Sequence, residues 1–162
     1  MTNSRRTKKI CYLSIFTSLS TLLTLFTKIP IGKSYLHLGN VVSQLSAISL
    51  GPIEGGIVGG LGQALADYIK GYNVFIIPTL IIKFLSGFIF GIITRKEKKY
   101  IILCSACFIY FVITALGYFF FKIFFLGLDV KIALFGIIRS IIANLAVTFV
   151  TISLVPFLKI IN

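Results

Sequence analysis

The chain has 162 residues, of which 57% are hydrophobic and 12% are charged. A soluble domain usually has about 25% charged residues and about 45–50% apolar ones. A core of this size is too small to bury so much apolar surface, so the sequence predicts an integral membrane protein. It excludes a soluble enzyme, a disordered chain and a nucleic-acid-binding domain. The formal net charge of +12 does not indicate nucleic acid, because the cations stand at the ends of apolar runs.

Six apolar runs are predicted to cross the membrane as helices, since about 17–25 apolar residues cover the hydrocarbon core. They are residues 10–27, 38–53, 55–70, 74–94, 101–121 and 132–158. The second and third runs are short, and the pair Gly51-Pro52 separates them as a helix-ending turn would. The chain has no polar linker and no clear internal repeat. We therefore expect a single all-α membrane domain over residues 1–162.

The distribution of cations predicts the orientation of this domain. With six crossings both termini share one side. That side would hold Arg5, Arg6, Lys8, Lys9, Arg95, Lys96, Lys98, Lys99 and Lys159. The opposite loops would hold Lys28, Lys33, Lys70, Lys122 and Lys131. Because loops with more cations stay in the cytoplasm, both termini are predicted to be cytoplasmic.

Small residues recur at a spacing typical of close helix contacts. The stretch 55–62 (GGIVGGLG) contains two glycine pairs four residues apart. In a membrane helix this spacing favours close packing of backbones over a phosphate-binding loop. Ser14 and Ser18 form a further pair of this kind in the first run. They would contact either a neighbouring helix of the same chain or a partner subunit, and the residues alone leave both interpretations open.

Three charged residues from three predicted helices fall in the outer half of the membrane. At about 1.5 Å of rise per residue, Lys83, Arg139 and Asp67 lie roughly 12, 10 and 6 Å from the outer ends of their helices. Asn144 lies about 8 Å deeper than Arg139. Ionisable groups at such depth usually face a cavity or a partner. They would form either a polar ligand pocket or a structural ion pair, and the surplus positive charge favours an anionic or electron-rich ligand.

Further residues are placed to complete a pocket at this end. The loop Pro30–Asn40 carries Tyr35, His37 and Asn40 and is expected to cover the pocket from above. Tyr72 and Tyr118 lie at the same outer level, where aromatic residues also form the interface belt. The predicted substrate-binding residues are Tyr35, His37, Asn40, Asp67, Tyr72, Lys83, Tyr118, Arg139 and Asn144.

The distribution of carboxylates and nucleophiles along the sequence argues against catalysis. No pair of carboxylates and no nucleophile with a base lies at one depth, so we expect neither an enzyme nor a metal site. We also expect no cofactor.

Several motifs point to a known family. They are YLHLGN at 35–40, LGPIEGG at 50–56, GGLGQALAD at 59–67, GY at 71–72, PTLIIK at 78–83 and SG at 86–87. Together they resemble the substrate-binding S components of energy-coupling factor (ECF) vitamin transporters. The resemblance covers the whole six-span chain. It is closest to the branch named for riboflavin, which also contains pyridoxine- and thiamin-precursor-type members.

The resemblance implies a plasma-membrane subunit that binds a vitamin or vitamin precursor from outside and catalyses nothing. Its partners would be a membrane coupling subunit and two cytoplasmic ATPase subunits, and it would deliver its ligand by reorienting on the coupling subunit. Ser14 and Ser18 match the spacing of the family's docking motif. Lys83 and Asn144 fall where the family commonly has lysine and asparagine. A stand-alone carrier or channel working as a homo-oligomer is the main alternative, and a structural membrane protein without ligand is the third.

Two departures bear on the ligand. Asn40 stands where the family commonly has aspartate, and Ala143 stands where it commonly has glycine. The leading expectation for the ligand is a small aromatic heterocycle with hydroxyl groups, of pyridoxine or aminopyrimidine type.

Overall fold

The computed structural model describes residues 3–27, 29–31, 34–36, 38–95 and 99–160. The predicted α-helical class is confirmed in this part of the chain. The α-helices are α1 (Asn3–Phe26), α2 (Gly39–Ser49), α3 (Pro52–Ile69), α4 (Ile76–Thr94), α5 (Tyr100–Phe124) and α6 (Val130–Leu154). Two 3-10 helices are η1 (Asn73–Phe75) and η2 (Val155–Ile160), and two antiparallel strands are β1 (Ile29–Ile31) and β2 (Ser34–Leu36).

Four helical segments are long and apolar enough to cross a membrane. They are Arg6–Phe26, Asn73–Thr94, Tyr100–Phe124 and Val130–Phe157. The chain is therefore a multi-pass membrane protein. Helix α2 has only 11 residues, which at about 1.5 Å each covers roughly half of a hydrocarbon core about 30 Å thick. Six crossings and cytoplasmic termini stay predictions.

The structure moves the boundary between the two short predicted runs. Pro52 and Ile53 belong to α3, although the sequence assigned them to the preceding run. Proline suits this first turn because its missing N–H would have no partner there. Gly51, with φ +129°, makes the turn that only glycine adopts readily. The β1–β2 hairpin was not predicted, since three-residue strands are too short to show alternation.

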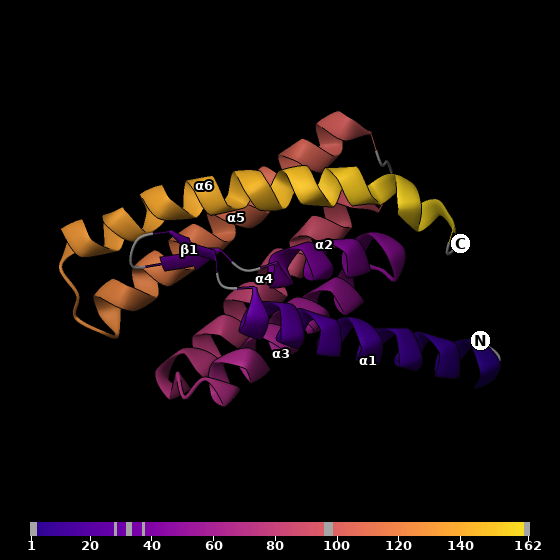
Figure 1. Cartoon of the computed structure of the whole chain (residues 1–162), viewed down its shortest axis with the longest axis horizontal. Coiled ribbons are helices and arrows are strands. Elements are labelled where there is room, and N and C mark those ends of the chain that lie inside the picture. Colours follow the sequence, from indigo (N-terminus) through magenta and orange to yellow (C-terminus); the bar gives the residue numbers. More distant parts are fainter. Residues whose placement is uncertain (1–2, 28, 32–33, 37, 96–98, 161–162) are drawn as a thin grey trace.

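Helix α3 lies at the centre of the fold and packs against α4, α2 and α1. Helix α5 lies between α4 and α6 (Figure 1). Both termini lie at one end of the molecule, whereas the β1–β2 hairpin and the α5–α6 connection lie at the other (Figure 1). The end with the hairpin is called the hairpin end below.

The glycines of α3 allow its neighbours to approach closely. A Cβ atom added at Gly59 would lie 2.5 Å from the Ser43 hydroxyl of α2, and one at Gly60 would lie 2.8 Å from a backbone oxygen of α4. Gly87 of α4 faces α3 in return, because its added Cβ would lie 2.5 Å from the Gly55 oxygen. The close packing predicted for the stretch 55–62 is confirmed.

The apolar core fills the half of the bundle nearer the termini. Phe90 of α4 and Leu103, Cys107 and Tyr110 of α5 are buried together with residues of α2. The Phe90 and Tyr110 rings meet edge to face, with centroids 6.2 Å apart. Tyr110 is the outermost of these α5 side chains, and beyond it towards the hairpin end the helices enclose a cavity.

Candidate functional site

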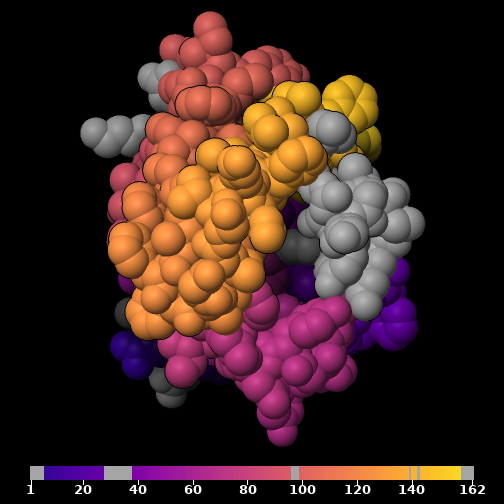
Figure 2. Space-filling model, turned by 90° about the vertical axis from the view of Figure 1, so that its left-hand side faces the viewer, coloured from indigo at the N-terminus to yellow at the C-terminus, as the bar shows by residue number. Residues whose placement is uncertain are grey.

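The cavity at the hairpin end has a volume of about 470 Å³. Ligand pockets usually have volumes of about 300–1,000 Å³, so a small ligand fits. Figure 2 looks at this end and shows the hollow between the surface of α5–α6 and that of α3–η1. All six α-helices contribute lining residues. The polar ones are Thr24, Asn40, Gln63, Asp67, Lys70, Tyr72, Thr79, Lys83, Tyr110, Thr114, Tyr118, Lys122, Ser140 and Asn144.

One amide oxygen joins four helices at the inner end of the cavity. Asn40 Oδ1 of α2 accepts hydrogen bonds from Lys83 Nζ of α4 at 2.9 Å and from Gln63 Nε2 of α3 at 2.9 Å. The Tyr110 hydroxyl of α5 donates to the same oxygen at 3.1 Å. Lys83 is only 2% exposed. A buried ammonium is costly unless acceptors surround it, so this oxygen helps to hold Lys83 in place.

A second polar group lies nearer the mouth. The Thr79 hydroxyl donates to Asp67 Oδ2 at 2.6 Å and lies 2.8 Å from the Tyr118 hydroxyl. Since Thr79 has one hydroxyl proton and gives it to Asp67, Tyr118 is the donor to Thr79. Lys83 Nζ lies 5.5 Å from the centroid of the Tyr110 ring and 5.8 Å from that of Tyr118. Both distances suit a cation–π contact, which links the two polar groups.

The structure bears on the ion pair with Asp67 that the sequence left open for Lys83. In the described part of the chain, Lys83 donates to Asn40 and forms no ion pair with Asp67. The structural ion pair between these two residues is therefore not formed. Arg139, the other partner considered for Asp67, lies in α6, and its side chain is outside the described part.

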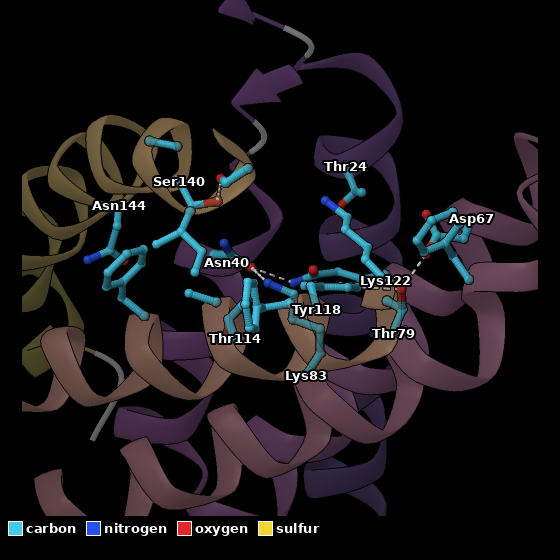
Figure 3. A pocket seen from close by; sticks show the side chains of 18 of the residues that line it. Thr24, Asn40, Asp67, Thr79, Lys83, Thr114, Tyr118, Lys122, Ser140 and Asn144 are labelled. Atoms are coloured by element: carbon cyan, nitrogen blue, oxygen red, sulfur yellow. Dashed lines mark hydrogen bonds between the residues drawn. The ribbon is translucent and has the colours of Figure 1, made fainter. Parts of the chain in front are cut away.

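Six of the nine predicted binding residues line one cavity. They are Asn40, Asp67, Tyr72, Lys83, Tyr118 and Asn144 (Figure 3 labels all but Tyr72). Their contact with a ligand stays a prediction. The Asn144 side chain has no hydrogen bond to another described residue, so the interhelical bond considered for it is not formed there.

The remaining three residues have no described side chain in the cavity. His37 lies outside the described residues, and Tyr35 is described only as part of the backbone of β2, as Arg139 is in α6. The placement of Asn40 in the covering loop was wrong, since it belongs to the first turn of α2. The β-strands lie above the pocket in Figure 3, where the sequence placed a covering loop.

Helical spacing would have identified several lining residues that the sequence analysis missed. Gln63 precedes Asp67 by four residues, Thr79 precedes Lys83 by four, and Lys122 follows Tyr118 by four. Residues four apart lie on one helix face, so each predicted residue indicates a neighbour. Lys122 was assigned to an outer loop, but α5 continues to Phe124 and carries it in the last turn.

Two turns hold the mouth of the cavity in shape. Gly71, with φ +76°, ends α3, and the Tyr72 N–H donates to the Asp67 backbone oxygen at 2.9 Å. This is a glycine-dependent helix C-terminus, and it turns Tyr72 back over Asp67. At the start of α6, the Asp129 carboxylate accepts from the Lys131 N–H at 2.7 Å and caps the helix.

A separate small-residue surface lies on α1. Ser14 and Ser18 are both exposed, and they line a shallow hollow with Ile15, Leu19 and Leu22. Their exposure favours the alternative in which they face a partner over contact with a neighbouring helix of the same chain. The Ser14 hydroxyl donates to the Ile10 oxygen of its own helix at 3.0 Å. Because the Ser14 hydroxyl is satisfied within its own helix, the small serine side chains leave a shallow, mostly apolar surface that suits the close approach of a partner helix. We call these five residues the α1 face.

Comparison with known proteins gives the family. A family model described as the ECF-type riboflavin transporter S component matches residues 4–161. A Pyrococcus woesei protein named "Uncharacterized protein in gap 3'region" is 40% identical over 82 residues, which are 49% of this chain and 55% of that protein. The chain thus spans about half the length of this relative. Because the family match covers nearly the whole chain, the protein belongs to the family of ECF-type riboflavin transporter S components.

Proposed function

We propose that this chain is the ligand-capturing subunit of an ATP-driven vitamin importer. The observation that carries the proposal is the cavity of about 470 Å³ at one end of a membrane bundle. Polar side chains are expensive in such a bundle, and they usually mark a ligand or ion pathway. Here side chains from four helices meet at Asn40 inside the cavity. The family match supports the same role.

The ligand is a small vitamin or vitamin precursor with an aromatic ring. Tyr110, Phe111 and Tyr118 line the cavity and offer aromatic surface for a ring. Asn144 offers both a donor and an acceptor, and it makes no hydrogen bond to another described residue. These groups suit a heterocycle with hydroxyl groups, of pyridoxine or aminopyrimidine type. Riboflavin, which the family description names, is a further candidate.

The cavity faces the outside of the cell in this proposal. Six crossings with cytoplasmic termini are supported by the position of both termini at one end of the molecule, opposite the cavity (Figure 1). In the plasma membrane, the cavity would then collect ligand from the medium. The chain would dock on a membrane coupling subunit through the α1 face and reorient there, driven by two cytoplasmic ATPase subunits.

Purification from the membranes of the source cells tests this assignment. A tagged chain is extracted in mild detergent, and its partners are identified by mass spectrometry. We expect one coupling subunit and two ATPase subunits in stoichiometric amounts. A homo-oligomer without ATPase subunits, active in ligand uptake after reconstitution alone, would contradict the proposal and favour the stand-alone carrier or channel.

A further inference from the structure

The charges that line the cavity do not balance. Lys83 and Lys122 line it together with Lys70, whose ammonium donates to the Thr24 backbone oxygen at 2.6 Å, whereas Asp67 is the one carboxylate among its lining residues that the structure describes. Buried or partly buried charges are stable when they are paired and hydrogen-bonded. A pocket inside a membrane bundle with this surplus is therefore suited to a ligand that brings negative charge.

The carboxylate does not neutralise the inner lysine. Asp67 accepts its hydrogen bond from the Thr79 hydroxyl, and Lys83 donates to the neutral amide of Asn40. Over the described side chains, neither Lys83 nor Lys122 forms an ion pair. Lys83 has two aromatic rings and an amide oxygen around it, so its charge is partly satisfied. The less satisfied of these two cations is Lys122.

Lys122 is held at the α5–α6 side of the cavity. It lies in the last turn of α5, and its ammonium contacts α6 at Gly136, where an added Cβ atom would lie 3.2 Å from Nζ. The absence of a side chain at Gly136 leaves room for this ammonium. Its side chain is half-buried and makes no hydrogen bond to another described residue. A cation is thus placed beside the cavity with no acceptor from the described chain.

The hydroxyl of Thr24 does not supply a second donor to the cavity. Thr24 of α1 lines the cavity and is 5% exposed, and its hydroxyl oxygen is buried without a hydrogen bond within the described structure. Because that oxygen has no accessible surface on the cavity, a ligand in the cavity does not reach it. In the view of Figure 3, Thr24 and Lys122 lie on the same side of the pocket, and Asn144 lies on the other.

We infer that the ligand carries an acidic group, a carboxylate or a phosphate, that binds Lys122 while its ring lies towards Asn144. The inference rests on the proposed function and narrows its substrate class to anionic heterocycles. Lys122 acts as the specificity-determining residue, because its ammonium forms a stronger, charge-assisted hydrogen bond with an anionic group than with a neutral one.

Matched pairs of probes test the inference. The full chain in mild detergent is titrated by calorimetry with riboflavin and riboflavin 5′-phosphate, with pyridoxine and pyridoxine 5′-phosphate, and with nicotinamide and nicotinate. Within a pair the ring is the same, and the anionic member carries an added phosphate or has a carboxylate in place of the carboxamide. We expect the anionic member of at least one pair to bind about tenfold or more tightly than its neutral partner, as a hydrogen bond to a charged group would provide.

Variants assign the preference to Lys122. Lys122→Met should abolish the preference for the anionic probe, and Lys122→Arg, which keeps the charge, should retain it. Lys131→Met is the matched control, since Lys131 lies at the same end of the molecule, is exposed and is not among the lining residues. This control should leave the preference unchanged.

The outcomes separate the inference from the proposed function. Binding of neutral members only, or an unchanged preference in Lys122→Met, would overturn the inference and leave the proposed function standing. Inorganic phosphate and phosphatidylglycerol are tested alone, and competition by either as strong as that of the anionic heterocycle would also overturn it. A panel in which no probe binds would overturn the inference, while the proposed function is tested separately by the copurification of the coupling and ATPase subunits.

Discussion

The ammonium of Lys83 on α4 donates a hydrogen bond of 2.9 Å to the amide oxygen of Asn40 on α2. A buried cation in this membrane bundle is thus held by a neutral acceptor. The Asn40 oxygen also accepts hydrogen bonds from Gln63 and Tyr110, so one side chain orders the inner end of the cavity. The positive charge of Lys83 is therefore not neutralised by a carboxylate of the described chain.

Replacing the acceptor should destabilise the fold. Asn40→Leu removes the oxygen that Lys83, Gln63 and Tyr110 share, and a hydrogen bond to a charged group contributes about 1.5–3 kcal/mol. We expect a loss of stability in this range, measured as a lower melting temperature in detergent. Asn40→Asp keeps an acceptor and should retain the fold. The control is Asn73→Leu, because Asn73 is exposed in η1. Equal effects of the two leucine substitutions would contradict the shared role of Asn40.

Removing the inner cation should weaken binding. Lys83→Met keeps much of the side-chain volume and removes the charge, so affinity for the ligand should fall about tenfold or more. Stability should change little, since a buried charge is replaced by an apolar group. Isothermal titration with the ligand released from the purified protein measures the effect. Lys8→Met, on the exposed start of α1, is the control. Unchanged binding with altered stability would favour a purely structural role.

The contact between α3 and α4 should not tolerate a methyl group at Gly87. The added carbon would lie 2.5 Å from the Gly55 oxygen, so the helices must separate. Gly87→Ala should therefore lower the free energy of unfolding by about 1–3 kcal/mol. Leu61→Ala on the exposed face of α3 should change it by less than about 0.5 kcal/mol. A Gly87→Ala variant as stable as the parent would show that the two helices do not pack as described.

The α1 face should be needed for docking and not for ligand binding. Ser14→Leu combined with Ser18→Leu fills the hollow and should prevent copurification of the coupling subunit. Ligand affinity should stay within twofold. Ser105→Leu is the matched control, because Ser105 is also exposed and donates to the oxygen four residues before it. Retention of the coupling subunit by the double variant would contradict docking through this face.

Single cysteines should report the orientation. With Cys11, Cys104 and Cys107 replaced by alanine, Lys131→Cys at the start of α6 should react with a membrane-impermeant maleimide added to whole cells. Lys99→Cys before α5 should react only after the cells are opened. The reverse pattern would contradict cytoplasmic termini.

The composition of the sequence and the lengths of its apolar runs predict the helical membrane class, because a helix needs a long apolar run to cross the lipid. Helices α4, α5 and α6 follow the predicted runs closely. The short segments were harder to predict. Helix α2 has only 11 residues, and the predicted apolar run 38–53 also includes the turn before Pro52 and the first two residues of α3. The position of Asn40 was missed for this reason, since a loop and the first turn of a helix look alike over a few residues.

The cavity was predicted in part because depth along a helix follows from residue number. Asp67, Lys83 and Asn144 were brought together in this way, and the structure places all three in one cavity. The partners of these residues depend on how the helices are rotated, which depth alone does not give. The bond from Lys83 to Asn40, in place of one to Asp67, is therefore a result of the packing of α2 against α3 and α4.

Mass spectrometry of the released ligand tests the central claim most directly. The chain is purified alone in mild detergent and denatured, and the small molecules released are identified and quantified. The account predicts one vitamin-type compound in about stoichiometric amount, bound through the cavity that Asn40 and Lys83 order. An empty protein, obtained again after growth with a mixture of vitamins, would contradict ligand capture.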